Sequence, residues 1–260
     1  MSATMKIAVA GATGRVGRPL VDALRARGCE VVAIARSTGV DVITGDGLAE
    51  ALDGVDVVVD AATSPSPDQV EATGFFRTAA RNLHETGQRA AVRRMVVVSI
   101  IGVDRFTAGY NAAKLAHEQA ALAGPVPVRI LRSAQFHELV PLLIEWGRQG
   151  DVSHVQEMRT QPVAASAVAE VLAGLATADD ALWSAPSTEA PILEVAGPRE
   201  ESMVAMATLL AGRRGEPLKI EGGDNPADPD HELYATDVLL PGPGATLAGP
   251  TFEEWLDDHS

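Results

Sequence analysis

A glycine-rich turn near the start of the chain constrains the fold more than any other feature. Gly11, Gly14 and Gly17 come directly after an apolar run at residues 7–10 and open a stretch with helical periodicity at residues 15–27. A dinucleotide pyrophosphate needs this order of strand, turn and helix, because it requires a tight turn, no obstructing side chain and the free N–H groups of a helix start. The spacing is G-x-x-G-x-x-G rather than G-x-G-x-x-G. The sequence therefore predicts a dinucleotide-binding corner at this turn.

The first half of the chain alternates short β-branched runs with longer helical patterns. This alternation is typical of βαβ units, and unbroken apolar runs suit strands covered by helices on both faces. We expect an α/β fold: a Rossmann-like, doubly wound parallel sheet in residues 1–133, with a small C-terminal substrate-binding region and acidic tail in residues 134–260, part of which returns to the core. The predicted strands are residues 7–10, 31–35, 41–44, 55–61, 95–99, 126–131 and 192–195. The predicted helices are residues 15–27, 47–52, 68–86, 110–123, 136–148, 166–176, 202–211 and 252–256. Loops are predicted at residues 221–229 and 241–244.

The charge distribution argues against one class of partner. The chain has 21 Lys and Arg against 35 Asp and Glu, a formal net charge of −14. Eleven acidic residues and one lysine lie from residue 216 onward, so the first 215 residues are nearly balanced. No basic tract marks a nucleic-acid surface, and we expect no nucleic-acid partner.

Several other classes are disfavoured by missing patterns. Cys29 is the only cysteine, so no intrachain disulfide forms, and the histidines show no metal-ligand spacing, so no metal is expected. The sequence has no G-x-S-x-G elbow and no P-loop lysine. It also lacks an apolar run of about 18 residues and a signal-peptide core, which predicts a cytoplasmic protein without a membrane partner.

The end of the second predicted strand bears on the choice of cofactor. NAD-binding domains usually place an acidic residue there, which holds the ribose 2′-OH. Here Arg36 and Ser37 follow the strand and could meet a 2′-phosphate together with Arg15. NADP (NADPH) is therefore favoured over NAD, the alternative being that Arg36 is a surface residue. Asp46 and Gly47 are predicted to flank the adenine, although a helix N-cap is an equally good use of Asp46.

Several stretches of the chain resemble the atypical branch of the short-chain dehydrogenase/reductase (SDR) superfamily, specifically its NmrA-like members. The stretches that carry the resemblance are residues 11–17, 54–62, 96–99, 110–114, 130–137 and 194–198. The resemblance covers about residues 5–215. It implies a Rossmann-like fold with a small C-terminal region over the cofactor.

Tyr110 and Lys114 form a Tyr-x-x-x-Lys pair. Four residues are about one helical turn, so both side chains lie on one face of the predicted helix. A nearby ammonium stabilises tyrosinate and lowers the tyrosine pKa from about 10 towards neutrality. Such a tyrosine can give a proton to a carbonyl oxygen while a hydride arrives from the nicotinamide. The family resemblance further implies that Lys114 holds the nicotinamide ribose and that Ser99 hydrogen-bonds the reacting oxygen.

The remaining candidates lie at the ends of predicted strands or in the glycine turn. The predicted cofactor-binding residues are Gly11, Thr13, Gly14, Arg15, Val16, Gly17, Arg36, Ser37, Asp46, Gly47, Ala61, Ala62, Thr63 and Lys114. Gln135, Phe136 and His137 are predicted to line the nicotinamide or substrate pocket, a packed histidine being an equal account of His137. Asn82 is predicted to be structural.

The leading functional hypothesis is an NADPH-dependent reductase or dehydrogenase of a small carbonyl, enone or quinone-like substrate. In it Tyr110 is the acid/base, Lys114 supports it and Ser99 orients the substrate. Two alternatives remain: a non-catalytic NADP(H)-binding redox sensor of NmrA type, and an epimerase or isomerase that retains its cofactor. The expected partner is a small molecule, and because long helices on a Rossmann sheet often pair, a homodimer is compatible with the sequence.

Overall fold

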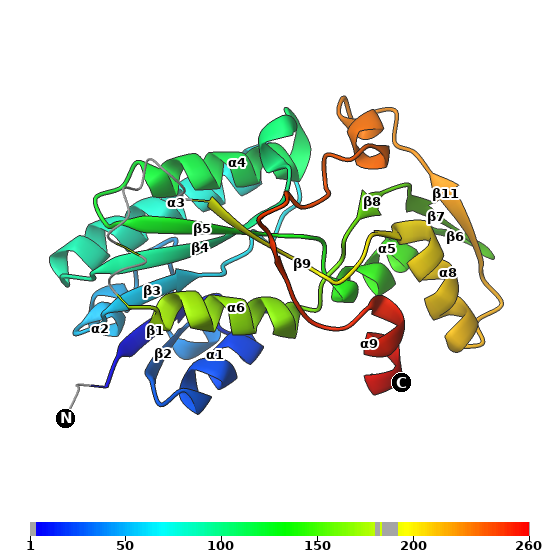
Figure 1. Cartoon of the computed structure of the whole chain (residues 1–260). Helices are drawn as coiled ribbons and strands as arrows, with labels where there is room; N and C mark the ends of the chain where they lie inside the picture. Colours follow the sequence, from blue (N-terminus) through cyan, green and yellow to red (C-terminus); the bar gives the residue numbers. More distant parts are fainter. Residues whose placement is uncertain (1–3, 180–182, 184–191, 260) are drawn as a thin grey trace.

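The computed structural model describes residues 4–179, 183 and 192–259. Its centre is a seven-stranded sheet in the order β12-β9-β5-β4-β3-β1-β2, in which every neighbouring pair runs parallel (Figure 1). The strands are β1 (Lys6–Ala10), β2 (Glu30–Ile34), β3 (Val57–Asp60), β4 (Arg94–Ile100), β5 (Val128–Ser133), β9 (Ile192–Ala196) and β12 (Thr246–Leu247). The predicted Rossmann-like α/β class is confirmed.

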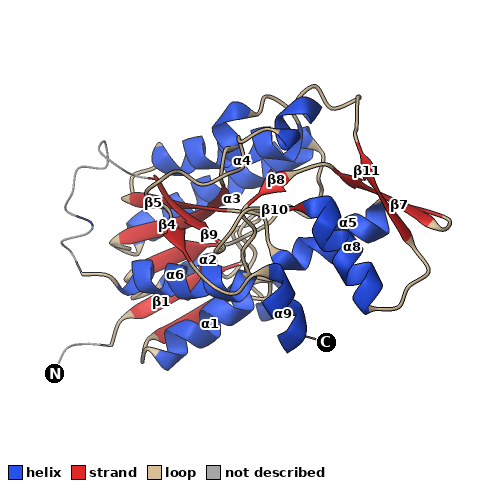
Figure 2. Ribbon diagram, turned by 45° about the vertical axis from the view of Figure 1, so that its right-hand side comes forward, coloured by secondary structure: helices blue, strands red, loops and turns tan. Residues whose placement is uncertain are grey.

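Helices cover both faces of the sheet (Figure 2). On one face pack α1 (Gly17–Ala26) and α6 (Ala165–Thr177), and on the other α2 (Leu48–Leu52), α3 (Gln69–Arg89) and α4 (Gly109–Leu122). Side chains alternate between the two faces along each strand. In β1, for example, Ile7 and Val9 enter the core beneath α1 and α6, whereas Ala8 and Ala10 enter the opposite core. Two apolar faces therefore account for the unbroken apolar runs in the sequence.

The strand predicted at residues 41–44 was wrong, because this segment forms a turn. The Asp41 carboxylate accepts the amide of Ile43 at 2.7 Å, and the amide of Gly45 donates to the Asp41 carbonyl at 2.9 Å. From α3, the Asn82 side chain donates to the carbonyls of Val42 and Ile43, at 2.8 and 2.9 Å. These bonds occupy groups that a sheet ladder would need, so β2 is the edge of the sheet. Asn82 thus has the structural position that the sequence predicted.

A further hydrophobic cluster lies beyond the carboxyl edge of the sheet, on the right in Figure 1. It contains α5 (Val140–Trp146), α8 (Met203–Arg213) and α9 (Phe252–Asp258), with a three-stranded sheet of β11 (Lys219–Gly223), β7 (Val152–Gln156) and β6 (Arg148–Gln149). The loop predicted at residues 221–229 was therefore wrong at its start, since β11 pairs with β7 there. The remaining short elements are β8 (Arg159–Thr160), β10 (Glu201–Ser202), η1 (Arg36–Thr38), η2 (Val103–Arg105), η3 (His137–Leu139) and η4 (His231–Ala235).

The chain returns to the central sheet after this cluster. Strand β9 pairs with β5, and β12 near the C-terminus pairs with β9. None of the helices in the described part of the chain is long and apolar enough to cross a membrane.

Candidate active site

Two adjoining cavities lie at the carboxyl edge of the central sheet. The larger has a volume of about 650 Å³ and the smaller about 470 Å³. Both are bordered by Thr13 and Gly14 of the glycine turn and by residues 61–63, which follow β3. The crevice outside the carboxyl ends of parallel strands is where open α/β sheets bind ligands. Because they share a wall, the two cavities form the halves of one elongated site.

Most of the predicted site residues meet at these cavities. The predicted residues that line the larger cavity are Thr13, Gly14, Arg15, Val16, Ala61, Ala62, Thr63, Ser99, Tyr110, Lys114 and Phe136. Gly11 and Arg36 line the smaller cavity. Among the described residues, the predicted ones that line neither cavity are Gly17, Ser37, Asp46, Gly47, Gln135 and His137.

The glycine turn is packed too tightly for side chains at two positions. Gly11 has φ +75°, and a Cβ there would lie 2.6 Å from the carbonyl oxygen of Ala61. A Cβ on Gly17 would lie 2.0 Å from the Gly11 carbonyl oxygen. Gly17 therefore brings the start of α1 against the turn rather than lining a cavity. In the described part of the chain no acceptor meets the amides of Arg15 and Val16, so the start of α1 presents unused N–H groups to the larger cavity.

The smaller cavity differs from the prediction on one side. Arg36 lines it and is exposed, without an ion pair among the described residues. The turn at residues 40–43 also lines this cavity, whereas Asp46 and Gly47 do not. The Asp46 carboxylate instead accepts the hydroxyl of Thr44 at 2.7 Å, and Gly47 precedes α2 with φ +68°. The turn escaped prediction because it was read as a strand.

Tyr110, Lys114 and Ser99 converge on the larger cavity. Lys114 follows Tyr110 by one turn of α4, and its Nζ donates to the Val98 carbonyl oxygen at 2.7 Å, one residue before Ser99 in β4. Ser99 is 1% exposed, and its Oγ has no hydrogen-bond partner among the described residues. A buried hydroxyl without a partner is costly, so the cavity wall holds a polar group suited to a ligand atom.

The electrostatics of the pair differ from the sequence-based expectation. Burial raises the pKa of Tyr110 to about 12, although a hydrogen bond with Thr63 acts in the opposite direction. Burial lowers the pKa of Lys114 to about 8, and the charges of Asp60 and Glu118 oppose this shift. The predicted lowering of the tyrosine pKa by Lys114 was wrong, because desolvation of the hydroxyl dominates and Lys114 Nζ is bonded to Val98.

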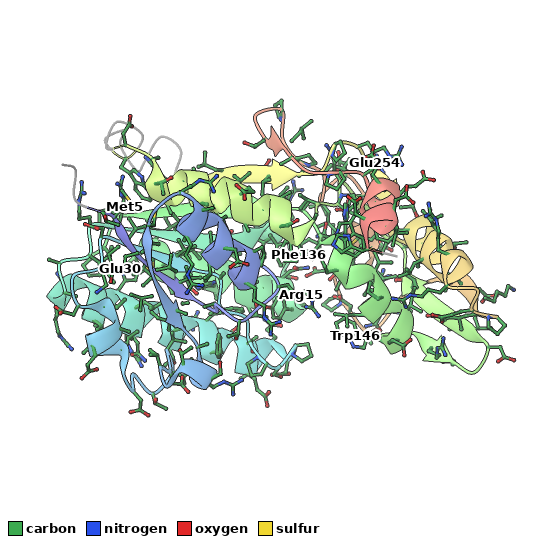
Figure 3. The ribbon with its side chains drawn as sticks, turned by 90° about the horizontal axis from the view of Figure 1, so that it is seen from below. Met5, Arg15, Glu30, Phe136, Trp146 and Glu254 are labelled. Carbon is green, nitrogen blue, oxygen red and sulfur yellow. The ribbon has the colours of Figure 1, made fainter. Side chains whose placement is uncertain are left out.

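Of the three predicted substrate residues, Phe136 alone lines the larger cavity, close to Arg15 in Figure 3. The side chain of Gln135 accepts the hydroxyl of Thr160. His137 is fully buried, its Nε2 lies 3.2 Å from the Pro162 carbonyl oxygen, and its ring meets Phe252 and Trp255 of α9 edge-on. The sequence left two roles open for His137, a packed histidine and a residue of the pocket lining, and the structure shows the packed one.

Further wall residues were not singled out in the sequence. Those of the larger cavity are Arg18, Pro19, Val98, Ile100 and Ser133, and those of the smaller are Ile34, Ala35, Val40, Asp41, Val42, Ile43, Pro65 and Phe75. Several of these residues, such as Val98 and Ile100 on either side of Ser99, are next in sequence to predicted residues at strand ends. Their position beside those residues could have identified them.

The combination of a glycine turn that opens a helix and a two-part cavity at the carboxyl edge of a parallel sheet defines a dinucleotide-binding protein of the Rossmann class. Residues 11–179 match the model of the NAD(P)H-binding family. The chain belongs to this family. No curated protein has a significantly similar sequence.

Solved structures share the fold over almost the whole chain. One is MoeE5 in complex with UDP-glucuronic acid and NAD, at 22% identity and a TM-score of 0.70, covering 98% of this chain and 100% of that one. Another is dTDP-4-dehydrorhamnose reductase from Bacillus anthracis in complex with NADP, at 14% identity and a TM-score of 0.69, with 98% of each chain covered. A third is an SDR superfamily protein from Agrobacterium tumefaciens with bound NAD, at 19% identity and a TM-score of 0.64, covering 97% and 95%. The expected NAD(P)-binding family is confirmed by the family model, and the expected Rossmann-like fold by these structures.

Proposed function

We propose that the chain is an NADP(H)-dependent reductase of a small carbonyl substrate in which Tyr110 is the proton donor. The observation that carries this proposal is the convergence of three side chains on one cavity wall beside the glycine turn: Tyr110, Lys114 and the unpartnered hydroxyl of Ser99. A proton donor and an unpartnered hydroxyl from residues that line one cavity suit a substrate oxygen that accepts from each.

The residues around the glycine turn fit a dinucleotide. The unused amides of Arg15 and Val16 and the positive end of α1 favour a pyrophosphate. Lys114, at the wall of the larger cavity, would hold the nicotinamide ribose. When bound, the reduced nicotinamide supplies a hydride to the carbonyl carbon.

The chain itself supplies the proton. With a pKa of about 12, Tyr110 stays protonated at neutral pH, so its hydroxyl acts as a donor. It would give this proton to the carbonyl oxygen of the substrate, which becomes the hydroxyl oxygen of the alcohol product. The Ser99 hydroxyl donates a hydrogen bond to the same oxygen and orients it. Phe136 offers an apolar wall to the rest of the substrate.

The preference for NADP(H) rests on Arg36 in the smaller cavity. Its guanidinium has no ion pair within the described residues, and no acidic residue follows β2 directly to hold a ribose 2′-OH. A 2′-phosphate offers Arg36 a charge-assisted partner.

The deciding experiment measures oxidation of NADPH by the purified protein over aldehydes, ketones, enones and quinones. The chain has two tyrosines, Tyr110 and Tyr234, which provide a matched pair. Tyr110→Phe should reduce kcat by about 10²–10⁴-fold and leave the NADPH Kd unchanged, because it removes the proton and little volume. Tyr234→Phe should retain turnover, since Tyr234 lies outside the cavity linings.

The alternatives predict other results. If the wild-type protein binds NADPH but none of the tested substrates leads to its oxidation, the result supports the NmrA-type sensor and contradicts the reductase. Nucleotide that co-purifies and is not released supports a cofactor-retaining epimerase or isomerase. The complexes of MoeE5 with UDP-glucose and with UDP-glucuronic acid, each with NAD, make sugar nucleotides the substrates to test for that alternative.

A further inference from the structure

Three polar side chains form a buried line that begins at the wall of the larger cavity and leads away from it. Lys114 Nζ lies 3.1 Å from Nδ1 of His117, and Nε2 of His117 lies 3.0 Å from a carboxylate oxygen of Asp60. Lys114 is 6% exposed, His117 0% and Asp60 1%. The line joins one face of α4 to the carboxyl end of β3. Asp60 ends that strand and directly precedes residues 61–63, which line both cavities.

The two contacts of His117 fix where its proton lies. An ammonium only donates, so Nδ1 is the acceptor for Lys114. Nε2 then carries the hydrogen and donates to Asp60, whose other oxygen accepts the amide of Ala62 at 3.0 Å. Burial and the adjacent Lys114 lower the pKa of His117, in agreement with a neutral ring.

Phe76 holds the geometry of this line. The His117 ring stacks on Phe76 with centroids 4.7 Å apart, and Lys114 Nζ lies 4.6 Å from the centre of the same ring. The imidazole can therefore turn little without losing its stacking contact.

The charges around the line divide into two groups. Glu118 of α4 accepts two hydrogen bonds from Arg132 of β5, at 2.9 and 2.8 Å, and Arg132 also pairs with Asp104 of η2 at 2.6 Å. Glu118 therefore has its own cation. Asp60 forms no lysine or arginine ion pair in the described part of the chain and reaches Lys114 through His117.

Other titratable groups face the line from neighbouring elements. His84 of α3 is bonded to the Ala121 carbonyl oxygen at 2.8 Å, and Tyr110 lies one turn before Lys114. Neither contacts Asp60 by a hydrogen bond among the described residues. The pKa of Lys114 is thus raised by Asp60, which it reaches through His117, and more weakly by Glu118, which is already paired with Arg132.

We propose that Asp60 and His117 are positioning residues for Lys114: they direct its ammonium towards the Val98 carbonyl at the cavity wall and keep it charged. The consequence for turnover rests on the proposed function. The positioning itself does not, because it concerns groups within the chain.

This role predicts how Lys114 titrates when the line is broken. Burial lowers the pKa of Lys114 to about 8, and the carboxylate of Asp60 counteracts this shift. Removing the Asp60 charge in Asp60→Asn should lower the pKa of Lys114 by about 1–3 units, enough to make the amine mostly neutral at physiological pH.

The composition of the chain allows a direct measurement. Lys6, Lys114 and Lys219 are its only lysines, so 13Cε-lysine labelling gives three resonances, and Lys6→Arg and Lys219→Arg assign them. We expect the Lys114 midpoint to fall in Asp60→Asn and in His117→Phe, which keeps a ring against Phe76 without nitrogen. In His117→Gln, whose amide can accept at one atom and donate at the other, the midpoint should stay near that of the wild type. Asp104→Asn, which alters the Arg132 pair alone, is the matched control.

The outcomes separate this proposal from the proposed function. An unchanged Lys114 midpoint in both Asp60→Asn and His117→Phe overturns the positioning role, whether or not the protein turns over a substrate. A lowered midpoint supports it even if no carbonyl is reduced. If these variants do not fold, 15N shifts of the wild-type His117 ring decide: a neutral Nε2–H tautomer supports the proposal and an Nδ1–H tautomer contradicts it. Where turnover is found, the pH profile of kcat should shift in His117→Phe and return in His117→Gln.

Discussion

The carboxylate of Asp230 accepts the backbone amide of Ala108, at 2.8 Å, immediately before the helix that carries Tyr110 and Lys114. The same carboxylate accepts the amide and the hydroxyl of Thr107, at 2.6 and 2.9 Å. Asp230 is separated from Ala108 by more than a hundred residues, yet it holds the two residues that precede α4, whose own N-cap Ala108 makes no side-chain cap bond. One acid of the negatively charged C-terminal segment thus holds the chain immediately before this helix.

Replacing Asp230 should weaken this attachment. In Asp230→Ala, the two amides and the hydroxyl lose a buried, charged acceptor, so we expect a loss of about 1–3 kcal/mol in the free energy of unfolding. Urea denaturation measures it. Asp237→Asn, an exposed acid of the same segment, should leave stability unchanged. Equal effects of the two substitutions would show that the bonds of Asp230 to Thr107 and Ala108 do not stabilise the fold.

Asp230 should also contribute to the pH dependence of stability. Burial acts to raise its pKa, but the bonds from Thr107 and Ala108 outweigh burial, and the pKa is lowered. A group whose folded pKa is depressed stabilises the protein above its unfolded pKa of about 3.9 and loses that contribution as the pH falls through the folded value. Unfolding followed from neutral to acid pH should therefore show a decline in the wild type that is smaller in Asp230→Asn.

The glycine turn is the part of the site that sequence predicted best, and the reason is local. A turn, its preceding strand and its following helix are contiguous, so the residue types alone report the packing that Gly11 and Gly17 allow. The Tyr110 and Lys114 pair was predictable for the same reason, since helix periodicity places both on one face.

The buried line behind Lys114 was not predictable in this way. Asp60 ends an apolar run and His117 is one of several polar residues in α4, and nothing local joins them. Only the packing of α4 against the central sheet brings them within 3.0 Å. The turn at residues 41–44 was misread for a related reason, because the bonds from Asn82 come from a distant helix.

Gly17→Ala should disturb the turn without removing any contact to a ligand. The added Cβ would collide with the Gly11 carbonyl oxygen, so α1 must move away and the unused amides at its start are displaced. We expect NADPH binding to weaken at least 10-fold, measured by fluorescence titration. Gly74→Ala in α3 has open space around its Cβ and should leave binding intact while stabilising the helix by roughly 0.5–1 kcal/mol.

Arg36→Ala tests the cofactor preference. If Arg36 holds a 2′-phosphate, the substitution should weaken NADPH binding about 10–100-fold and leave the NADH Kd nearly unchanged, because NADH lacks that group. Arg25→Ala, an exposed arginine near the other end of α1 that lines neither cavity, controls for net charge. Equal NADPH and NADH affinities in the wild type would contradict the preference.

His137 should make the packing of α9 sensitive to acid. Burial lowers its pKa to about 4, while the bond to the Pro162 carbonyl acts the other way. The unfolded chain, with an ordinary histidine pKa of about 6.5, binds this proton first, so stability falls as the pH drops from about 6.5 to about 4, by roughly 3 kcal/mol in total. His137→Phe keeps an aromatic ring against Phe252 and Trp255 but cannot titrate, so its melting temperature should decline less over this range. Parallel pH profiles for the wild type and His137→Phe would show instead that other groups control the acid sensitivity.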